Sequence, residues 1–299
     1  MPVLSLSGSD LHYEQHGEGT PVVLVHGSVL DGAMTWAAQQ PLTEHWRLVI
    51  VDRPGFGSSP PVDRVDFATD AELVVEILDR AKQLWGVDRV HLVGPSYGGV
   101  VCLLAAAIRP EALRSLTVIE PPAFAVAAGN PAVDDLVARL KEHGRSGPRE
   151  NPARFLDGFL RLIGSSTKLP DPLPPPLAQG AAMLTVEREP GEADIALTQL
   201  ARARFPKLVV SGAHSAAFDA VCDVLERALG GDRAVIGGEG HSIPRAGGAF
   251  NQRLAQFLTD ADGGQTTVHP RRGGRHLAPD RLNVRQAGRW PHAAAAWSR

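Results

Sequence analysis

Short runs of apolar residues recur along the chain and alternate with stretches whose apolar residues follow a helical period. The runs are rich in valine, isoleucine and leucine and cover residues 21–25, 46–51, 90–93, 116–119, 207–210 and 233–236. Such runs are typical of strands buried on both faces, and helical stretches such as 32–42 and 71–85 lie between them. The alternation predicts an α/β fold, with a mostly parallel central sheet flanked by helices. Residues 4–7 and 11–15 predict an opening hairpin.

The alternation stops between residues 125 and 204. Helical patterns occur there at 133–143, 152–164 and 193–203, without a convincing buried strand. Residues 168–176 contain successive prolines, which cannot continue a helix, so an extended or turned segment is expected. We therefore expect a helical cap or lid at 125–204, inserted into a core domain that is formed by residues 1–124 and 205–262.

Residues 263–299 differ from the rest of the chain. They lack apolar periodicity and are rich in arginine, glycine, histidine and proline. Such a composition buries too little apolar surface to offset the entropy lost on ordering. We expect a disordered basic tail, and a role in binding nucleic acid or a membrane is the alternative.

Composition and charge limit the classes of function that this chain can have. Of the 299 residues, 43% are hydrophobic and 21% are charged, and the net charge of −3 does not favour nucleic acid. The apolar runs are far shorter than the ~20 residues of a membrane span, and residues 1–8 lack the basic start of an export signal. We therefore expect a cytoplasmic protein with no nucleic-acid partner and no membrane span. Cys102 and Cys222 are expected to be buried, reduced thiols.

The first candidate for chemistry is Ser96. It stands in Gly94-Pro95-Ser96-Tyr97-Gly98, which matches G-x-S-x-G between a buried-type run and a helical stretch. A serine at such a sharp turn has a strained backbone, so its neighbours must lack bulk. The turn lifts the hydroxyl clear of the sheet and places it at a helix N-terminus, where backbone N–H groups stabilise negative charge. We expect Ser96 to be a nucleophile, and a structural turn serine is the alternative.

An oxyanion hole is expected beside that serine. His26-Gly27-Ser28 follows the apolar run 21–25, and an oxyanion hole takes one N–H from such a loop and one from the residue after the nucleophile. We expect these donors to be the N–H groups of Ser28 and Tyr97, with Val29 as the neighbour that could replace Ser28. His26 itself is expected to be structural.

The expected general base is His241, in the Gly240-His241-Ser242 loop directly after the last apolar run. Its imidazole would take the proton of Ser96 during attack and return it to the leaving group. His214, on a neighbouring loop, is the rival candidate.

These motifs together resemble the α/β-hydrolase superfamily over about residues 1–260. The resemblance rests on His26-Gly27, on the Asp-Arg-Pro-Gly-Phe-Gly-Ser segment at 52–58, on the Ser96 turn and on Gly240-His241, which follow one another in the family's order. It implies a serine esterase- or lipase-like protein with a helical cap. It also implies that 52–58 is a structural turn, where Asp52 or Arg53 braces the loops.

The acid that orients the histidine departs from the usual family pattern. The family generally places it three residues past a glycine after the strand that follows the cap, but Ser215 stands there. A minority of members place it after the strand that follows the nucleophile helix, where this chain has Glu120. A carboxylate at that strand end would share one rim of the sheet with Ser96 and His241. Glu120 is the expected acid, and Asp219 is the alternative.

These residues predict a serine hydrolase that cleaves carboxylic esters of small or medium hydrophobic substrates through an acyl-enzyme. Val29, Phe155 and Phe159 are the expected substrate contacts, although packing against the core domain is an alternative for the two phenylalanines. The same motifs also fit a carbon–carbon bond hydrolase, a cofactor-free perhydrolase, an acyltransferase or a non-catalytic ligand-binding protein. No metal-ligand spacing, phosphate-cradling glycine loop or dinucleotide fingerprint is present in the sequence, so no metal and no cofactor are expected.

Overall fold

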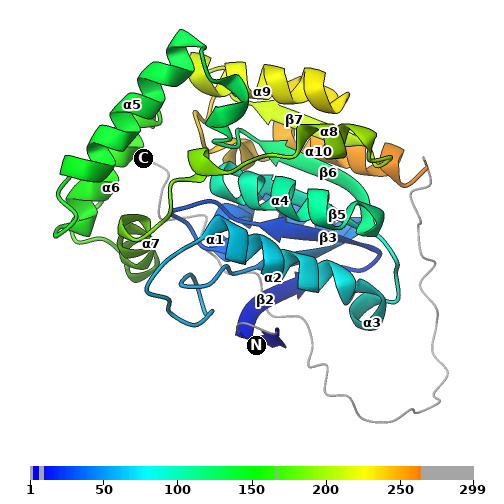
Figure 1. The fold of residues 1–299 in the computed structure, drawn as a ribbon. Coiled ribbons are helices and arrows are strands. Elements are labelled where there is room, and N and C mark those ends of the chain that lie inside the picture. The colour runs from blue at the N-terminus through cyan, green and yellow to red at the C-terminus, as the bar shows by residue number, and fades with distance from the viewer. Residues whose placement is uncertain (1–2, 7–9, 166–167, 264–299) are drawn as a thin grey trace.

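An eight-stranded sheet forms the centre of the molecule, with strand order β1-β2-β4-β3-β5-β6-β7-β8 (Figure 1). The computed structural model describes residues 3–6, 10–165 and 168–263. β1 and β2 pair antiparallel as the opening hairpin, β2 runs antiparallel to β4, and β3 to β8 pair in parallel. The strands are β1 (Val3–Ser5), β2 (Asp10–His16), β3 (Thr20–Val25), β4 (Trp46–Val51), β5 (Val90–Pro95), β6 (Leu113–Ile119), β7 (Lys207–Ser211) and β8 (Asp232–Val235). The expected α/β fold is confirmed.

Side chains of each central strand alternate between two apolar layers. In β3, Val23 and Val25 pack into the layer of α2, α4 and α9, while Val22 and Leu24 pack into the layer of α10. Burial on both faces explains why the strands are continuous apolar runs. The helices outside the 125–204 segment are α1 (Gly32–Thr35), α2 (Phe67–Asp79), α3 (Ala81–Trp85), α4 (Ser96–Ile108), α9 (Ala216–Leu229) and α10 (Gly248–Ala261).

Two of the helices predicted outside residues 125–204 differ from the structure. The stretch 32–42 is not one helix, because α1 ends at Thr35 and a 3₁₀ helix (Ala37–Glu44) follows with Pro41 inside it. The stretch 71–85 starts earlier than predicted, where the side chain of Asp66 accepts a hydrogen bond from Ala68 N–H at the start of α2. It breaks at Arg80, which separates α2 from α3.

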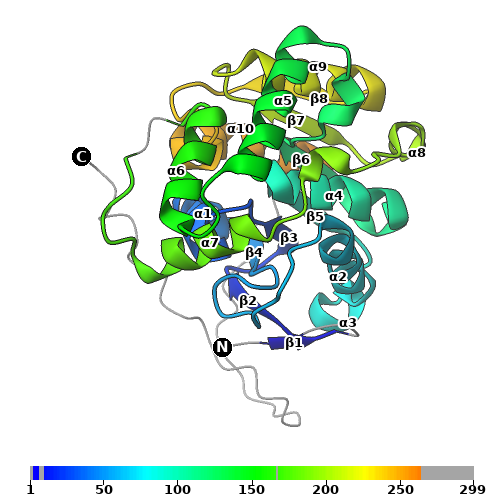
Figure 2. The same ribbon diagram turned by 60° about the vertical axis from the view of Figure 1, so that its left-hand side comes forward.

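Between β6 and β7 the chain forms α5 (Pro131–Ser146), α6 (Pro152–Leu162), α7 (Pro175–Thr185) and α8 (Leu197–Arg202). Helices α5, α6 and α7 group at one end of the sheet in Figure 1 and come forward in Figure 2. The sequence did not predict α7, because the prolines before it indicated extended chain. Pro175 occupies its first turn, where proline is tolerated since the N–H there has no partner within the helix.

Three further expectations concern the cysteines, membrane-spanning helices and the C-terminal residues. Cys102 in α4 and Cys222 in α9 are buried and free, as expected. Among the described residues, no helix combines the length and hydropathy needed to cross a bilayer. Residues 264–299, which contain almost all of the expected basic tail, lie outside the described part of the chain.

Candidate active site

Ser96 is the first residue of α4 and directly follows β5. Its φ of +49° lies in the left-handed region, which is strained for a residue with a side chain. Glycine is required at the neighbouring positions because a side chain there would collide with backbone atoms. A Cβ on Gly98 would lie 2.4 Å from the carbonyl oxygens of Val25 and His26, and one on Gly94 would lie 2.4 Å from the Gly98 carbonyl oxygen. The predicted strand–turn–helix setting of Ser96 is therefore present.

Glu120 stands beside Ser96 because of strand register. β5 and β6 are parallel, and Pro95 lies opposite Ile119, so Ser96 and Glu120 leave two neighbouring strands at the same level. The Glu120 residue is fully buried, with 0% of its surface exposed, and its φ is +44°. One carboxylate oxygen, Oε1, accepts a hydrogen bond of 2.7 Å from Gly212 N–H on the loop after β7.

His241 connects these two residues. Its Nδ1 lies 2.7 Å from Glu120 Oε2, and its Nε2 lies 2.9 Å from Ser96 Oγ. Since the carboxylate only accepts, Nδ1 carries the hydrogen, and the Nε2 lone pair faces the serine hydroxyl. Burial raises the pKa of Glu120, but hydrogen bonds from His214, His241 and Gly212 outweigh it and hold that pKa at about 2. The acid is therefore ionised throughout the neutral range.

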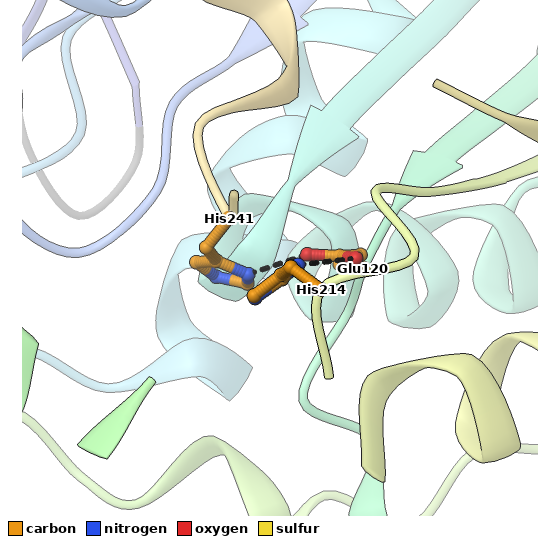
Figure 3. A group of neighbouring side chains, drawn as sticks. All are labelled: Glu120, His214 and His241. Atoms are coloured by element: carbon orange, nitrogen blue, oxygen red, sulfur yellow. Dashed lines mark hydrogen bonds and ion pairs between the residues drawn. The ribbon is translucent and has the colours of Figure 1, made fainter. Parts of the chain in front are cut away.

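His214 also contacts the carboxylate, as Figure 3 shows. Its Nδ1 lies 3.3 Å from Glu120 Oε1. Ligand-type atoms of Glu120, His214 and His241 lie within 4.8 Å of one another, so they could hold a metal ion. An ion that bound His241 Nδ1 would have to break the 2.7 Å bond from that atom to Glu120.

The alternative acid, Asp219, lies elsewhere. Its carboxylate accepts from the hydroxyl of Ser211 and lies 3.5 Å from a guanidinium nitrogen of Arg233. Its side chain is 33% exposed. The His241 imidazole bonds Glu120, so the structure brings together the preferred set of Ser96, His241 and Glu120.

The loop after β3 packs directly against the serine. A Cβ on Gly27 would lie 3.3 Å from Ser96 Cβ, so this loop approaches as closely as its backbone allows. His26 accepts from Arg53 N–H at Nε2 and donates from Nδ1 to the Gly27 carbonyl oxygen. Burial is the largest cause that lowers the pKa of His26 to about 3. It is therefore a neutral residue that holds the loop, as expected.

Asp52 and Arg53 brace the loops around the serine. Asp52 accepts from His12 Nδ1 at 2.7 Å and from Gly32 N–H at 3.0 Å. The Arg53 guanidinium is buried, donates to Asp70 and to the Gly27 carbonyl oxygen, and lies over the ring of Tyr97 at 4.3 Å. These contacts agree with the structural role predicted for this turn.

Sequence reasoning missed Glu187, in the segment after α7. Its Oε1 accepts a 2.7 Å hydrogen bond from Ser28 Oγ, and its Oε2 lies 3.8 Å from Arg53. Burial raises the pKa of Glu187 to about 7. The segment around it had no pattern that connects it to the β3 loop, so only the folded chain reveals this link.

Two cavities meet at Ser96. Cavity A has a volume of about 350 Å³ and cavity B of about 360 Å³, and both are lined by Ser28, Ser96, Phe159, Ile163 and His241. Phe155 lines cavity A and Val29 lines cavity B, so all three expected substrate contacts border a cavity beside the serine. Such volumes are in the range of small-molecule sites.

Cavity A is lined by both apolar and charged side chains. Phe124, Val137 and Phe218 are among its apolar residues. Its charged lining residues include Asp134, Lys141, Arg149, Glu187, Arg188, Glu189 and Glu192.

The comparisons with known proteins agree with this architecture. A sequence model described as the alpha/beta hydrolase fold matches residues 20–161. A hydrolase structure from Pseudomonas aeruginosa is 25% identical, with a TM-score of 0.61, and the match covers 86% of this chain and 97% of that one. The fold, the serine turn and these matches define one class of protein. The chain has the α/β-hydrolase fold, and residues 20–161 match the sequence model of that fold.

Among its relatives are esterases. A pimeloyl-(acyl-carrier protein) methyl ester esterase of Aeromonas salmonicida is 38% identical over 37% of this chain and 42% of its own length. The enzyme of the same name from Methylococcus capsulatus is 33% identical over 50% of this chain and 51% of its own length. The chain thus spans about half the length of the curated relatives it matches.

Proposed function

We propose that this protein is a serine hydrolase that cleaves carboxylic esters through an acyl-enzyme. The observation that carries the proposal is the hydrogen-bonded series from Ser96 Oγ through the His241 ring to Glu120, which opens onto two cavities. In this proposal Ser96 is the nucleophile, His241 the general base and Glu120 the orienting acid. The relatives named as methyl ester esterases support the reaction class.

The proposed reaction has two halves. In the first, Ser96 Oγ attacks the ester carbonyl carbon while His241 Nε2 takes the serine proton, and Glu120 stabilises the imidazolium that forms. The carbonyl oxygen becomes an oxyanion, which backbone N–H groups of Ser28 and Tyr97 stabilise. The carbon–oxygen bond to the alcohol then breaks, and the alcohol leaves with the proton from His241.

In the second half, water replaces the alcohol. His241 takes a proton from a water molecule as its oxygen attacks the acyl carbon. The bond to Ser96 Oγ breaks, the serine recovers its proton from His241, and the carboxylic acid leaves. The site thus returns to its starting state with no net change in protons on the protein.

The substrates we propose are esters with small or medium hydrophobic groups. The cavity walls next to Ser96 are mainly apolar, with Val29, Phe155 and Phe159 among the contacts. An engineered cavity of ~150 Å³ binds benzene, so each cavity here holds a larger group. In the same proposal, residues 125–204 act as a cap that covers the site, because α5, α6 and α7 carry much of the wall of cavity A.

A series of p-nitrophenyl esters from acetate to octanoate tests this function. Wild-type protein is expected to release p-nitrophenol with a preference for medium chains, and Ser96→Ala is expected to abolish turnover. Ser5→Ala is the matched control, because Ser5 is exposed on β1, far from the site in sequence and at the sheet edge. Equal turnover by Ser96→Ala and wild type would refute the proposal. Binding of the esters without turnover would instead indicate a ligand-binding protein.

A further inference from the structure

His214 is a largely buried titratable residue that the proposed reaction does not use. Its side chain is 12% exposed and lies between the catalytic-site acid and the end of α6. Nδ1 lies 3.3 Å from Glu120 Oε1, and Nε2 lies 3.1 Å from the Ile163 carbonyl oxygen. One ring therefore links the loop after β6 to the helical segment above it.

The ring is closely fitted in this position. A Cβ on Gly164 would lie 2.9 Å from His214 Cδ2, and one on Gly212 would lie 3.2 Å from His214 Nδ1. On another side the ring stacks near Phe218, with centroids 6.0 Å apart. Glycines at both neighbouring backbone positions leave the space that the imidazole needs.

The partners of the ring determine which form it adopts. The Ile163 carbonyl oxygen can only accept, so Nε2 carries a hydrogen. A neutral ring in that tautomer would turn its Nδ1 lone pair toward the Glu120 carboxylate. The imidazolium donates to the Ile163 carbonyl oxygen and forms an ion pair of 3.3 Å with Glu120, and the contact with Glu120 raises the pKa of His214 above its usual range despite burial. The ionisable groups that face this ring are Glu120, His241 on the loop after β8 and Asp219 on α9.

The contacts of His214 with Glu120 and Ile163 affect both the candidate acid and the cavity wall. Glu120 Oε1 is held by Gly212 N–H and by His214, which leaves Oε2 directed at His241. Ile163 is the C-cap residue of α6 and lines both cavities, so fixing its carbonyl oxygen fixes a shared part of the cavity wall.

We propose that His214 is a positioning residue that couples the acid of the site to the cap: it orients Glu120 toward His241 and holds the end of α6 over the two cavities. The inference rests on the proposed ester hydrolysis. It also gives a role to the loop after β7, where the usual family acid is replaced by Ser215 and His214 supplies the contact to Glu120 instead.

The kinetic test compares His214→Phe with wild type on p-nitrophenyl acetate and hexanoate. Phenylalanine keeps a ring beside Phe218 but makes neither polar contact. We expect kcat to fall about tenfold on both esters, the loss typical of one charge-assisted hydrogen bond. We expect KM to rise about fivefold on hexanoate, the effect of one neutral hydrogen bond, and to change little on acetate, which is too short to depend on the Ile163 wall. His214→Gln is expected to recover part of the loss, because its amide can donate to one partner at a time.

The pH dependence of KM separates this role from a merely structural one. The pKa of His214 is raised, so both contacts are complete below that pKa. As the pH rises through it, the ring keeps one hydrogen on Nδ1 beside the charged Glu120 carboxylate, and the hydrogen bond from Nε2 to the Ile163 carbonyl oxygen is lost. Wild-type KM for hexanoate should therefore rise in that range, while KM of His214→Phe stays flat. His45→Phe is the matched control, because His45 is exposed and lies before β4.

Hydrogen exchange tests whether His214 holds the end of α6, without relying on turnover. Amides at the end of α6 should exchange faster in His214→Phe and His214→Gln than in wild type, and at the wild-type rate in His45→Phe. Wild-type exchange and wild-type KM in the two His214 variants would overturn the inference. Equal rises of KM on both esters, with unchanged exchange, would also overturn it. Absence of ester turnover in wild type would instead overturn the proposed function. The exchange measurement would still show whether His214 holds the end of α6.

Discussion

Replacing Glu120 by glutamine changes one atom and tests which residue orients His241. Gly212 N–H donates to Glu120 Oε1, so the glutamine must turn its carbonyl oxygen toward Gly212 to avoid a clash of two donors. Its NH₂ group then faces His241 Nδ1, which has to accept. The ring hydrogen moves to Nε2, where it faces Ser96 Oγ and prevents the ring from taking the serine proton.

The expected size of the effect follows from that tautomer. An aspartate-to-asparagine change in a serine protease, which also leaves the histidine in the wrong tautomer, lowers kcat about 10⁴-fold. We therefore expect Glu120→Gln to lower kcat by roughly 10³- to 10⁴-fold, with KM within a few-fold of wild type, since the cavity walls do not change. The pKa of Glu120 falls from its usual 4.5 to about 2, which corresponds to on the order of 3 kcal/mol of preference for the ionised form.

The assay is turnover of p-nitrophenyl butyrate at pH 7.5, with the melting temperature and far-UV circular dichroism of each variant recorded alongside. Asp219→Asn is the matched comparison, because its carboxylate contacts Ser211 and Arg233 rather than His241. If Glu120→Gln kept more than a tenth of wild-type kcat, the assignment of the acid would be wrong. A large loss in Asp219→Asn with little change in Glu120→Gln would move the role to Asp219.

Three further predictions concern stability. Because the pKa of Glu120 is lowered from 4.5 to about 2, its contribution to the free energy of unfolding is complete above pH 4.5 and is lost as the pH falls toward 2; urea midpoints of wild type and Glu120→Gln should converge across that window. Gly98→Ala should cost more than about 3 kcal/mol or prevent folding, since its Cβ would meet two carbonyl oxygens at 2.4 Å, whereas Gly248→Ala, with open space around it, should change the urea midpoint little. Arg53→Met should lower the free energy of unfolding by about 3–5 kcal/mol, because it leaves Asp70 and Glu187 buried without their cation; an unchanged midpoint would contradict this.

The strands and the serine turn could be predicted because each depends on a local pattern. The buried strands are continuous apolar runs, and the run at 90–93 leads directly into the glycine-flanked Ser96. Helix α7 could not be found in the same way, because prolines that indicate extended chain also occur in a first helical turn. The stretch 32–42 follows a helical period, but Pro41 lies within it and the chain forms a 3₁₀ helix there.

The sequence indicates contacts between distant segments less clearly than it indicates strands and turns. Glu120 could be chosen because parallel strands end at one rim of the sheet, so its place in the sequence already limited its place in space. Glu187 had no such limit, and the place of His214 after β7 did not indicate its contact with Ile163. Their partners, Ser28 and Ile163, lie 159 and 51 positions away along the chain, and only the packing of the helical segment on the core brings them together.

Ser96, Glu120 and His241 are held by the fold to different degrees, which bears on how the proposed activity would be lost on heating. Ser96 and Glu120 emerge from adjacent strands whose ladder ties Pro95 to Ile119, so their separation persists until the sheet itself melts. His241 instead belongs to a loop that contains Gly237, Gly238 and Gly240, and such segments open at a lower free energy than core strands. Thermal inactivation should therefore begin as a reversible detachment of the imidazole, at temperatures where circular dichroism still reports an intact fold.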